Sequence, residues 1–200
     1  GFEDRDAEAR RRTMVRSVTE GLATIGIDAA AVDDVILTHL HYDHIGGFAQ
    51  FPRATFHLQD RELQFATGRA MTHRLLRHGF TLSHITAVVG LVYDERVMFH
   101  DGDDELAPGL SIHHVGGHTD GLQVVRVHTE RGWLVLASDA SHYYEHLERG
   151  RAFTTVFHVG AMLEGHRRCQ ALASEPWIIV PGHDPAVLER REAIVAALRA

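Results

Sequence analysis

The sequence has a single cysteine, Cys169, among its 200 residues, so it cannot form an internal disulfide. That is typical of a protein from a reducing compartment. No apolar run approaches the roughly 20 residues that a membrane-spanning helix needs. Basic residues are the minority charge, 20 Lys and Arg against 27 Asp and Glu, for a formal net charge of −7. A nucleic-acid-binding protein would be expected to carry a basic face, and none is evident here.

Repeats, low-complexity stretches and linkers are also absent, so we expect one domain over residues 1–200. The chain starts at Gly1 without an initiator methionine or a signal-like segment. We predict a cytoplasmic location, with a targeting segment outside the sequence left open. The composition predicts no nucleic-acid and no membrane partner, and it leaves a homodimer open.

What the sequence does have is histidine, 17 in all, and three of them fall with an aspartate within six positions of Thr38–Gly47. A strand sends alternate side chains to one face, so His39 and His41 should leave it together. The turn that follows should return Asp43 and His44 to the same point. Imidazole and carboxylate are the usual ligands of zinc-like ions. Four ligands at one corner predict two adjacent ions; the alternative is a histidine-rich solvated loop.

Three further ligand candidates, His118, Asp139 and His183, each follow an apolar stretch later in the chain. Strand ends present functional side chains to a common cleft. A carboxylate that closes a buried strand is costly unless it is paired or metal-bound. Each of these residues alone is weak support, because an Asp that caps a helix or a His that is hydrogen-bonded in the core is commoner than a metal ligand. With the first segment they make seven ligands for two ions.

Alternation of helical and strand patterns predicts an α/β or α+β protein. The segment from Thr67 to Tyr93 fits either an active-site flap or a helix with loops. We expect helices over residues 4–25, 60–65 (capped by Asp60), 159–173 and 189–199, a short turn over 29–32 capped by Asp28, and strands over 35–39, 54–58, 97–99, 110–115, 122–128, 133–137 and 177–180.

Four segments carry a family resemblance: residues 39–47 (HLHYDHIGG), 117–121 (GHTDG), 138–141 (SDAS) and 181–184 (PGHD). Together they resemble the metallo-β-lactamase superfamily and, within it, the N-acyl homoserine lactonase-like branch. The resemblance implies an α/β fold of the four-layer αββα type. Relatives of this branch carry further strands before their counterpart of Gly1, so we expect this chain to lack N-terminal strands.

The resemblance also implies a dinuclear hydrolase that opens the lactone ring of N-acyl homoserine lactones, which is quorum quenching. Its partner would be a small-molecule lactone. Two adjacent ions, zinc by first choice with iron, manganese or cobalt as alternatives, would acidify a water and polarise a carbonyl. Asp43 would in addition guide a proton. The implied ligands are His39, His41 and His118 for one ion, Asp43, His44 and His183 for the other, and Asp139 bridging both.

The sequence departs from the branch next to the bridging acid. Homoserine lactonases place a tyrosine three residues after it; here that position is His142, followed by Tyr143. Either side chain could donate a hydrogen bond to the substrate, so both are catalytic candidates. Candidates for orienting a ligand side chain are His113, Asp120, Asp184 and Thr38.

Several rival functions stay open. A hydrolase of another lactone, of the pyridoxolactonase type, is the nearest. A thioesterase of the glyoxalase II type uses nearly the same ligands but usually continues into a basic helical domain, whereas only residues 184–200 follow His183 here. A true β-lactamase normally lacks an acid like Asp139, and a diiron redox member usually has Glu in the place of His41. The non-enzyme alternative is an inactive metal-binding fragment.

Overall fold

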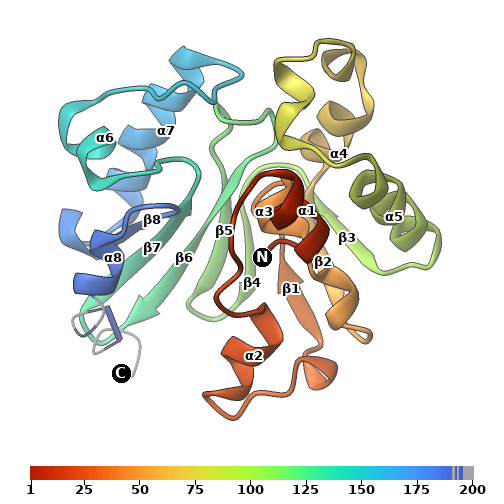
Figure 1. The fold of residues 1–200 in the computed structure, drawn as a ribbon. Coiled ribbons are helices and arrows are strands. Elements are labelled where there is room, and N and C mark those ends of the chain that lie inside the picture. Colours follow the sequence, from red (N-terminus) through yellow and green to blue (C-terminus); the bar gives the residue numbers. More distant parts are fainter. Residues whose placement is uncertain (191, 193, 196–200) are drawn as a thin grey trace. The chain divides into compact units, whose positions relative to one another are not determined.

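The computed structural model describes residues 1–190, 192, 194 and 195. The chain forms two compact units, Gly1–Phe99 and His100–Ala200, and each is described by itself. Each unit contributes a β-sheet with helices, so the chain is mixed α/β as expected (Figure 1). Within the described residues, no helix is long and apolar enough to span a membrane. A single domain over the whole chain stays a prediction.

The N-terminal helix of the first unit is broken, which corrects the single long helix expected from residue 4. Helix α1 covers Asp4–Ala9 and helix α2 covers Val18–Ala23. Arg11 lies between them with a φ of 53°, a left-handed conformation that cannot continue a helix. Ser17 then starts α2 with a reciprocal capping box, in which its side chain and that of the third helical residue each accept a backbone N–H.

The sheet of the first unit has three strands, and its first strand is shorter than expected. The strand ends at Ile36, so His39 does not lie on it. Backbone pairing with the neighbouring strand stops at Leu37, whose N–H donates to the carbonyl of His57 at 3.0 Å, and the chain then leaves the sheet. The order is β1-β2-β3, with β1 parallel to β2; the strands are β1 Asp34–Ile36, β2 Thr55–Gln59 and β3 Val97–His100.

Helices and short 3₁₀ turns fill the rest of this unit. Asp28 caps the first turn as expected, accepting the N–H of Ala30 at 2.9 Å. Asp60 is the first residue of its helix and not the cap. The segment after Thr67, for which a flap or a helix with loops was expected, ends in a twelve-residue helix that buries Ile85 and Val88. The elements are η1 Ala29–Ala31, α3 Tyr42–Ile45, η2 Phe48–Gln50, α4 Asp60–Thr67, η3 Arg69–Thr72, η4 Leu76–Gly79 and α5 Leu82–Tyr93.

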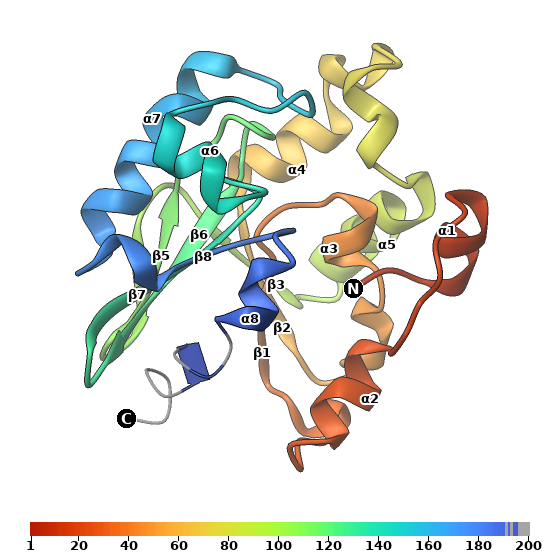
Figure 2. The same cartoon turned by 60° about the vertical axis from the view of Figure 1, so that its left-hand side comes forward.

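The second unit is built on a five-stranded sheet in the order β4-β5-β6-β7-β8. Figure 2 shows helices α6 and α7 of this unit beside its strands. Neighbours are antiparallel up to β7, and β6 and β7 form a hairpin in which Thr129 pairs with Gly132. The last strand, β8, returns parallel to β7 after a 3₁₀ turn that takes up Trp177. The acidic strand β4 was not expected. The strands are β4 Asp104–Ala107, β5 Leu110–His114, β6 Gln123–Thr129, β7 Gly132–Ser138 and β8 Ile179–Pro181.

One long helix of this unit, α7, packs on β7, and its buried Cys169 joins a core with Val124, Val135 and Ile179. The short helix α6 was not expected. The helix expected over residues 189–199 lies largely outside the described residues. The helical elements are α6 Tyr144–Arg149, α7 Val159–Leu172, η5 Pro176–Ile178 and α8 Ala186–Glu189.

Candidate functional site

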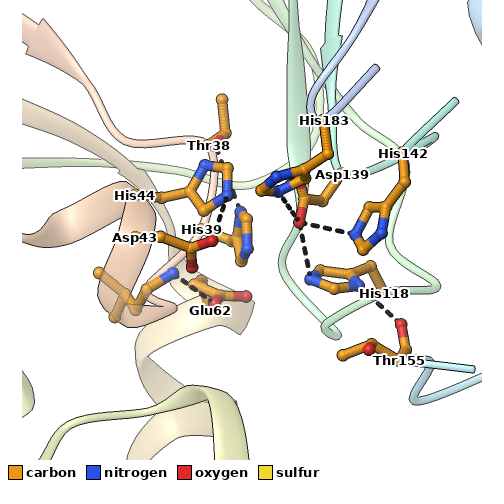
Figure 3. Close-up of polar contacts among 11 residues, drawn as sticks. Thr38, His39, Asp43, His44, Glu62, His118, Asp139, His142, Thr155 and His183 are labelled. Carbon is orange, nitrogen blue, oxygen red and sulfur yellow. Dashed lines mark hydrogen bonds and ion pairs between the residues drawn. The ribbon is translucent and has the colours of Figure 1, made fainter. Parts of the chain in front are cut away.

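The first unit gathers three imidazoles where the chain leaves β1. His39 is fully buried, its ring centroid lies 4.7 Å from that of His41, and it lies 4.0 Å from that of His44. His41 precedes the short helix α3, which carries Asp43 and His44. A helical turn, and not the plain turn expected, therefore brings these two side chains back toward His39. Figure 3 shows His39, Asp43 and His44 turned toward one another. The structure thus brings together the four ligand candidates of the first motif.

Backbone and side-chain contacts from later segments hold this histidine cluster. The buried carboxylate of Glu62 accepts the backbone N–H of Leu40, between the two histidines, at 2.8 Å. The hydroxyl of Thr38 lies 3.3 Å from Nδ1 of His39, as expected of an orienting residue. Gly79 lies so close to His41 that a methyl group there would overlap the ring, 2.6 Å from Nε2. These contacts hold the backbone between His39 and His41 and limit the space around the two rings.

Arg10 contacts Tyr42, which lies between His41 and Asp43 in the ligand motif. Its guanidinium carbon lies 3.7 Å from the ring centroid of Tyr42, a cation–π contact. Burial raises the pKa of Tyr42, and the neighbouring Asp43 carboxylate raises it further. Tyr42 therefore stays a neutral, covered ring beside the ligand motif.

In the second unit the ligand candidates converge on one carboxylate. Asp139 is 3% exposed and follows β7 directly. Its Oδ2 lies 3.0 Å from Nε2 of His142, 3.2 Å from Nε2 of His183 and 3.3 Å from Nε2 of His118, as Figure 3 shows. The ligand atoms of His118, Asp139 and His142 all lie within 4.8 Å of one another. Three imidazoles around one carboxylate form a donor set that suits zinc-like ions.

The tautomer of His118 tests whether a cation fits this cluster. Its Nδ1 lies 2.7 Å from the carbonyl oxygen of Thr155, and a carbonyl only accepts, so Nδ1 carries the proton. In the neutral ring Nε2 then points a lone pair at the Asp139 oxygen, 3.3 Å away. Two hydrogen-bond acceptors that face each other repel, and a cation between them would remove this repulsion. A second hydrogen bond of this kind is how proteins orient metal-ligating histidines, so the donor set fits a metal.

Close backbone approach positions Asp139. Ser138 precedes it with a φ of 46°, which is strained for a residue with a side chain. On the other side the end of β8 passes so near that a methyl group on Gly182 would overlap Oδ1 of Asp139. The Gly182 amide donates to the carbonyl of Ser141 at 3.0 Å, which ties the two loops together. Glycine is therefore required before His183.

The two catalytic candidates of the second unit differ in their surroundings. His142 stacks on Phe153, with ring centroids 3.8 Å apart and an interplanar angle of 25°, and reaches Asp139. Tyr143 is 44% exposed, and its backbone N–H donates to Nδ1 of His146 at 3.3 Å. Burial lowers the pKa of His146, and His142 acts in the same direction. His146 is thus a neutral acceptor that fixes the start of α6.

The other residues expected to orient ligands have different partners. Both ring nitrogens of His113 are taken, one by Asp103 and one by Ser111, each at 2.9 Å. Asp184 accepts the backbone N–H groups of Tyr144 and of Ala186, each at 2.9 Å, and so positions α6 and starts α8. His113 thus bonds side chains that are not ligand candidates, and Asp184 supports the backbone. Asp120 offers its backbone carbonyl, which accepts from Nε2 of His114 at 2.7 Å.

Three residues important for these clusters were missed from the sequence. Glu62 carried a signal, because it shares the buried face of α4 with Phe65 and Ala66, where a carboxylate needs a partner. Thr155 acts through its backbone carbonyl, which the residue type does not encode. Phe153 lies in an irregular segment that no periodicity marks.

Comparison with known proteins assigns the family. The sequence matches the metallo-beta-lactamase superfamily over residues 1–183. The chain belongs to that superfamily. The N-acyl homoserine lactonase AttM of Azorhizobium caulinodans is 31% identical over 172 residues, covering 80% of this chain and 61% of the relative. The N-acyl homoserine lactonase AiiA of Bacillus thuringiensis subsp. kurstaki is 27% identical over 166 residues, covering 82% and 60%. This superfamily member thus spans about 60% of the length of these relatives.

Solved superfamily structures confirm the fold class. An N-acyl homoserine lactone hydrolase with the product N-hexanoyl-L-homoserine at its catalytic metal centre is 25% identical, with a TM-score of 0.71 over 91% of this chain and 66% of that one. AidC, a dizinc quorum-quenching lactonase, has a TM-score of 0.66 at 19% identity, covering 86% and 65%, and shows the fold alone. The expected resemblance to N-acyl homoserine lactonases is confirmed. The loss of N-terminal strands stays an expectation.

Proposed function

We propose that this chain is part of a dinuclear-metal hydrolase that opens the lactone ring of N-acyl homoserine lactones. The observation that carries the proposal is the buried Asp139 with three imidazole nitrogens at its Oδ2. The tautomer of His118 set by Thr155 supports a cation there. Membership of the superfamily and likeness to homoserine lactonases support the substrate class.

The family resemblance, which combines the ligands of both units, supports two metal positions. Zinc is the first choice for these His and Asp donors, and iron, manganese or cobalt are alternatives. When bound, two such ions supply Lewis-acid polarisation of the lactone carbonyl and a water acidic enough to attack it near neutral pH. The proposed sets are His39, His41 and His118, then Asp43, His44 and His183, with Asp139 shared.

Residues of the chain would handle orientation and protons. His142 donates from Nε2 to Asp139 and is held flat by Phe153, so we assign it to positioning the shared carboxylate. Tyr143 is partly exposed and offers its hydroxyl to the substrate. Asp43 would accept the proton lost by the attacking water and return it to the ring oxygen, which stays tethered to the product.

The test is acid release from N-hexanoyl-homoserine lactone by the zinc- or cobalt-loaded protein, measured in a pH-stat with metal content determined in parallel. His183→Ala is the informative variant, because its side chain is one-third exposed and its loss should not unfold the protein. His128→Ala is the matched control, since His128 is exposed and packs only on Trp133 among the ring contacts seen. We expect acid release in wild type and control, and a loss of at least about 10²-fold in His183→Ala.

Other outcomes would reject the proposed substrate. Acid from a different lactone or from a glutathione thioester, with none from the homoserine lactone, would change the substrate class. Metal bound in the expected amount without acid from any of the three would favour a metal-binding protein that is not an enzyme.

A further inference from the structure

A second set of metal-ligating side chains lies in the first unit and is not used by the proposed function. It consists of Glu3, Asp6 and His84, which we call the α1–α5 cluster. Glu3 immediately precedes α1 and Asp6 lies in its first turn, while His84 lies in the first turn of α5. One ligand atom from each lies within 4.8 Å of the other two.

The distances within the α1–α5 cluster are those of ligands around an ion. Nε2 of His84 lies 3.5 Å from Oε1 of Glu3 and 3.6 Å from Oδ2 of Asp6. Both exceed the 2.7–3.2 Å of a normal N–H···O hydrogen bond. Zinc with bonds of about 2.0–2.1 Å in tetrahedral geometry separates its ligands by about 3.4 Å. The two distances from His84 are therefore close to the edge of a coordination tetrahedron.

Because His84 and Asp6 are buried, this arrangement of polar atoms is unfavourable without a cation. His84 is 1% exposed and Asp6 is 7% exposed. Among the described residues, neither Nε2 of His84 nor Oδ2 of Asp6 has a hydrogen-bond partner. A buried polar atom left in this state destabilises the fold, and more so if it is charged. The two atoms lie 3.6 Å apart, so one cation between them would satisfy both.

The outer contacts hold the ligands in position. The hydroxyl of Thr81 donates to the other oxygen of Asp6 at 2.9 Å, which leaves Oδ2 for the cluster. Arg5 pairs with the other oxygen of Glu3 at 2.9 Å and also donates to Ser83 at 2.7 Å. Each carboxylate is thus fixed by one oxygen and presents the second.

We propose that the α1–α5 cluster binds one zinc-class divalent ion that fastens α1 to the start of α5. Three protein ligands leave one tetrahedral position, and Glu3, whose side chain is 32% exposed, leaves that side open to water. An imidazole with two carboxylates favours zinc, cobalt or manganese over calcium, which takes six to eight oxygens. The role is structural, and it is independent of the proposed hydrolase activity.

The experiment counts zinc on the protein of residues 1–200 after dialysis against buffered zinc. Asp6→Asn keeps the size and the oxygen that accepts from Thr81 but replaces the ligating oxygen with an amide. Asp4→Asn is the matched control, because it removes the same charge from an exposed position on the same helix. We expect wild type and Asp4→Asn to bind one zinc more per chain than Asp6→Asn. Cobalt loading should show a matching difference in visible absorbance between these proteins.

A thermal measurement adds a second readout. Zinc at about 100 times its Kd should raise Tm by about 5–10 °C through this site, and this part of the rise should be missing in Asp6→Asn. If Asp6→Asn does not fold, Glu3→Gln replaces it, since Glu3 is partly exposed. Equal zinc content in wild type and the ligand variant, or full zinc retention by Glu3→Gln, would overturn the proposal and leave a buried ion pair.

Discussion

Gly182→Ala tests whether the position of Asp139 controls the second cluster. The added methyl carbon would lie 2.9 Å from the carbonyl carbon and oxygen of Ser138 and would overlap Oδ1 of Asp139. Ordinary contacts need roughly 3.5 Å or more, so both the Asp139 carboxylate and the Ser138 backbone have to move away from the new methyl group, by about 0.6–1 Å. Either shift displaces the Asp139 side chain, because Ser138 directly precedes it. Overpacking of this kind costs about 1–3 kcal/mol of unfolding free energy.

The expected result has two parts. Tm should fall by roughly 3–10 °C, and zinc retention should drop because the displaced carboxylate also carries Oδ2, the oxygen that three imidazoles share. A shift of about 1 Å in a catalytic group costs on the order of 10²-fold in rate, so lactone hydrolysis should fall by that factor. Metal content by mass spectrometry, calorimetry and pH-stat kinetics measure these effects. Gly21→Ala is the control, because a methyl group in that helix meets nothing within 4 Å and should stabilise by about 0.5–1 kcal/mol. Wild-type zinc content and rate in Gly182→Ala would refute the reasoning.

Two further predictions concern stability and reactivity. Ser17→Ala should lower the unfolding free energy by about 1 kcal/mol, because it removes the capping box of α2; urea denaturation measures this, and an unchanged midpoint would contradict it. Burial raises the pKa of Cys169 to about 12, so the thiol should resist Ellman's reagent at pH 8 until the protein is unfolded. Because the folded pKa lies above the unfolded value of 9.0, its contribution to stability is complete below pH 9 and is lost as pH rises toward 12; Cys169→Ala should flatten that decline.

The apolar strands could be predicted from the sequence. The positions where a helix is interrupted, or where a short polar helix begins, could not. Strands β5, β6 and β7 have apolar runs that predict each strand and its bounds to within one or two residues. The long N-terminal helix was wrong because apolar periodicity persists through residue 25, whereas the left-handed Arg11 interrupts the helix. Helix α6 was missed because its short sequence is polar on most sides. Its start is fixed by a tertiary contact, the Tyr144 amide with Asp184.

The ligand candidates were predictable because metal chemistry limits the residue types. Imidazoles and carboxylates at strand ends are few, and their spacing along the chain limits them further. The contacts that orient them were not predictable in the same way. Thr155 acts through a carbonyl, and Gly79 and Gly182 act by lacking a side chain, so none of the three has a chemical signature.

A sequence pattern finds a ligand cluster when its members share one motif or each follow an apolar strand. His39, His41, Asp43 and His44 are neighbours in the chain, and the pattern alone selected them. The α1–α5 cluster joins residues 3 and 6 to residue 84, and none of its members stands out by type or context. It becomes visible only because two buried atoms lack hydrogen bonds and lie at 3.6 Å, too far for a hydrogen bond and close to the edge of a zinc tetrahedron. Unsatisfied burial, and not residue type, is therefore the property that can reveal such a site.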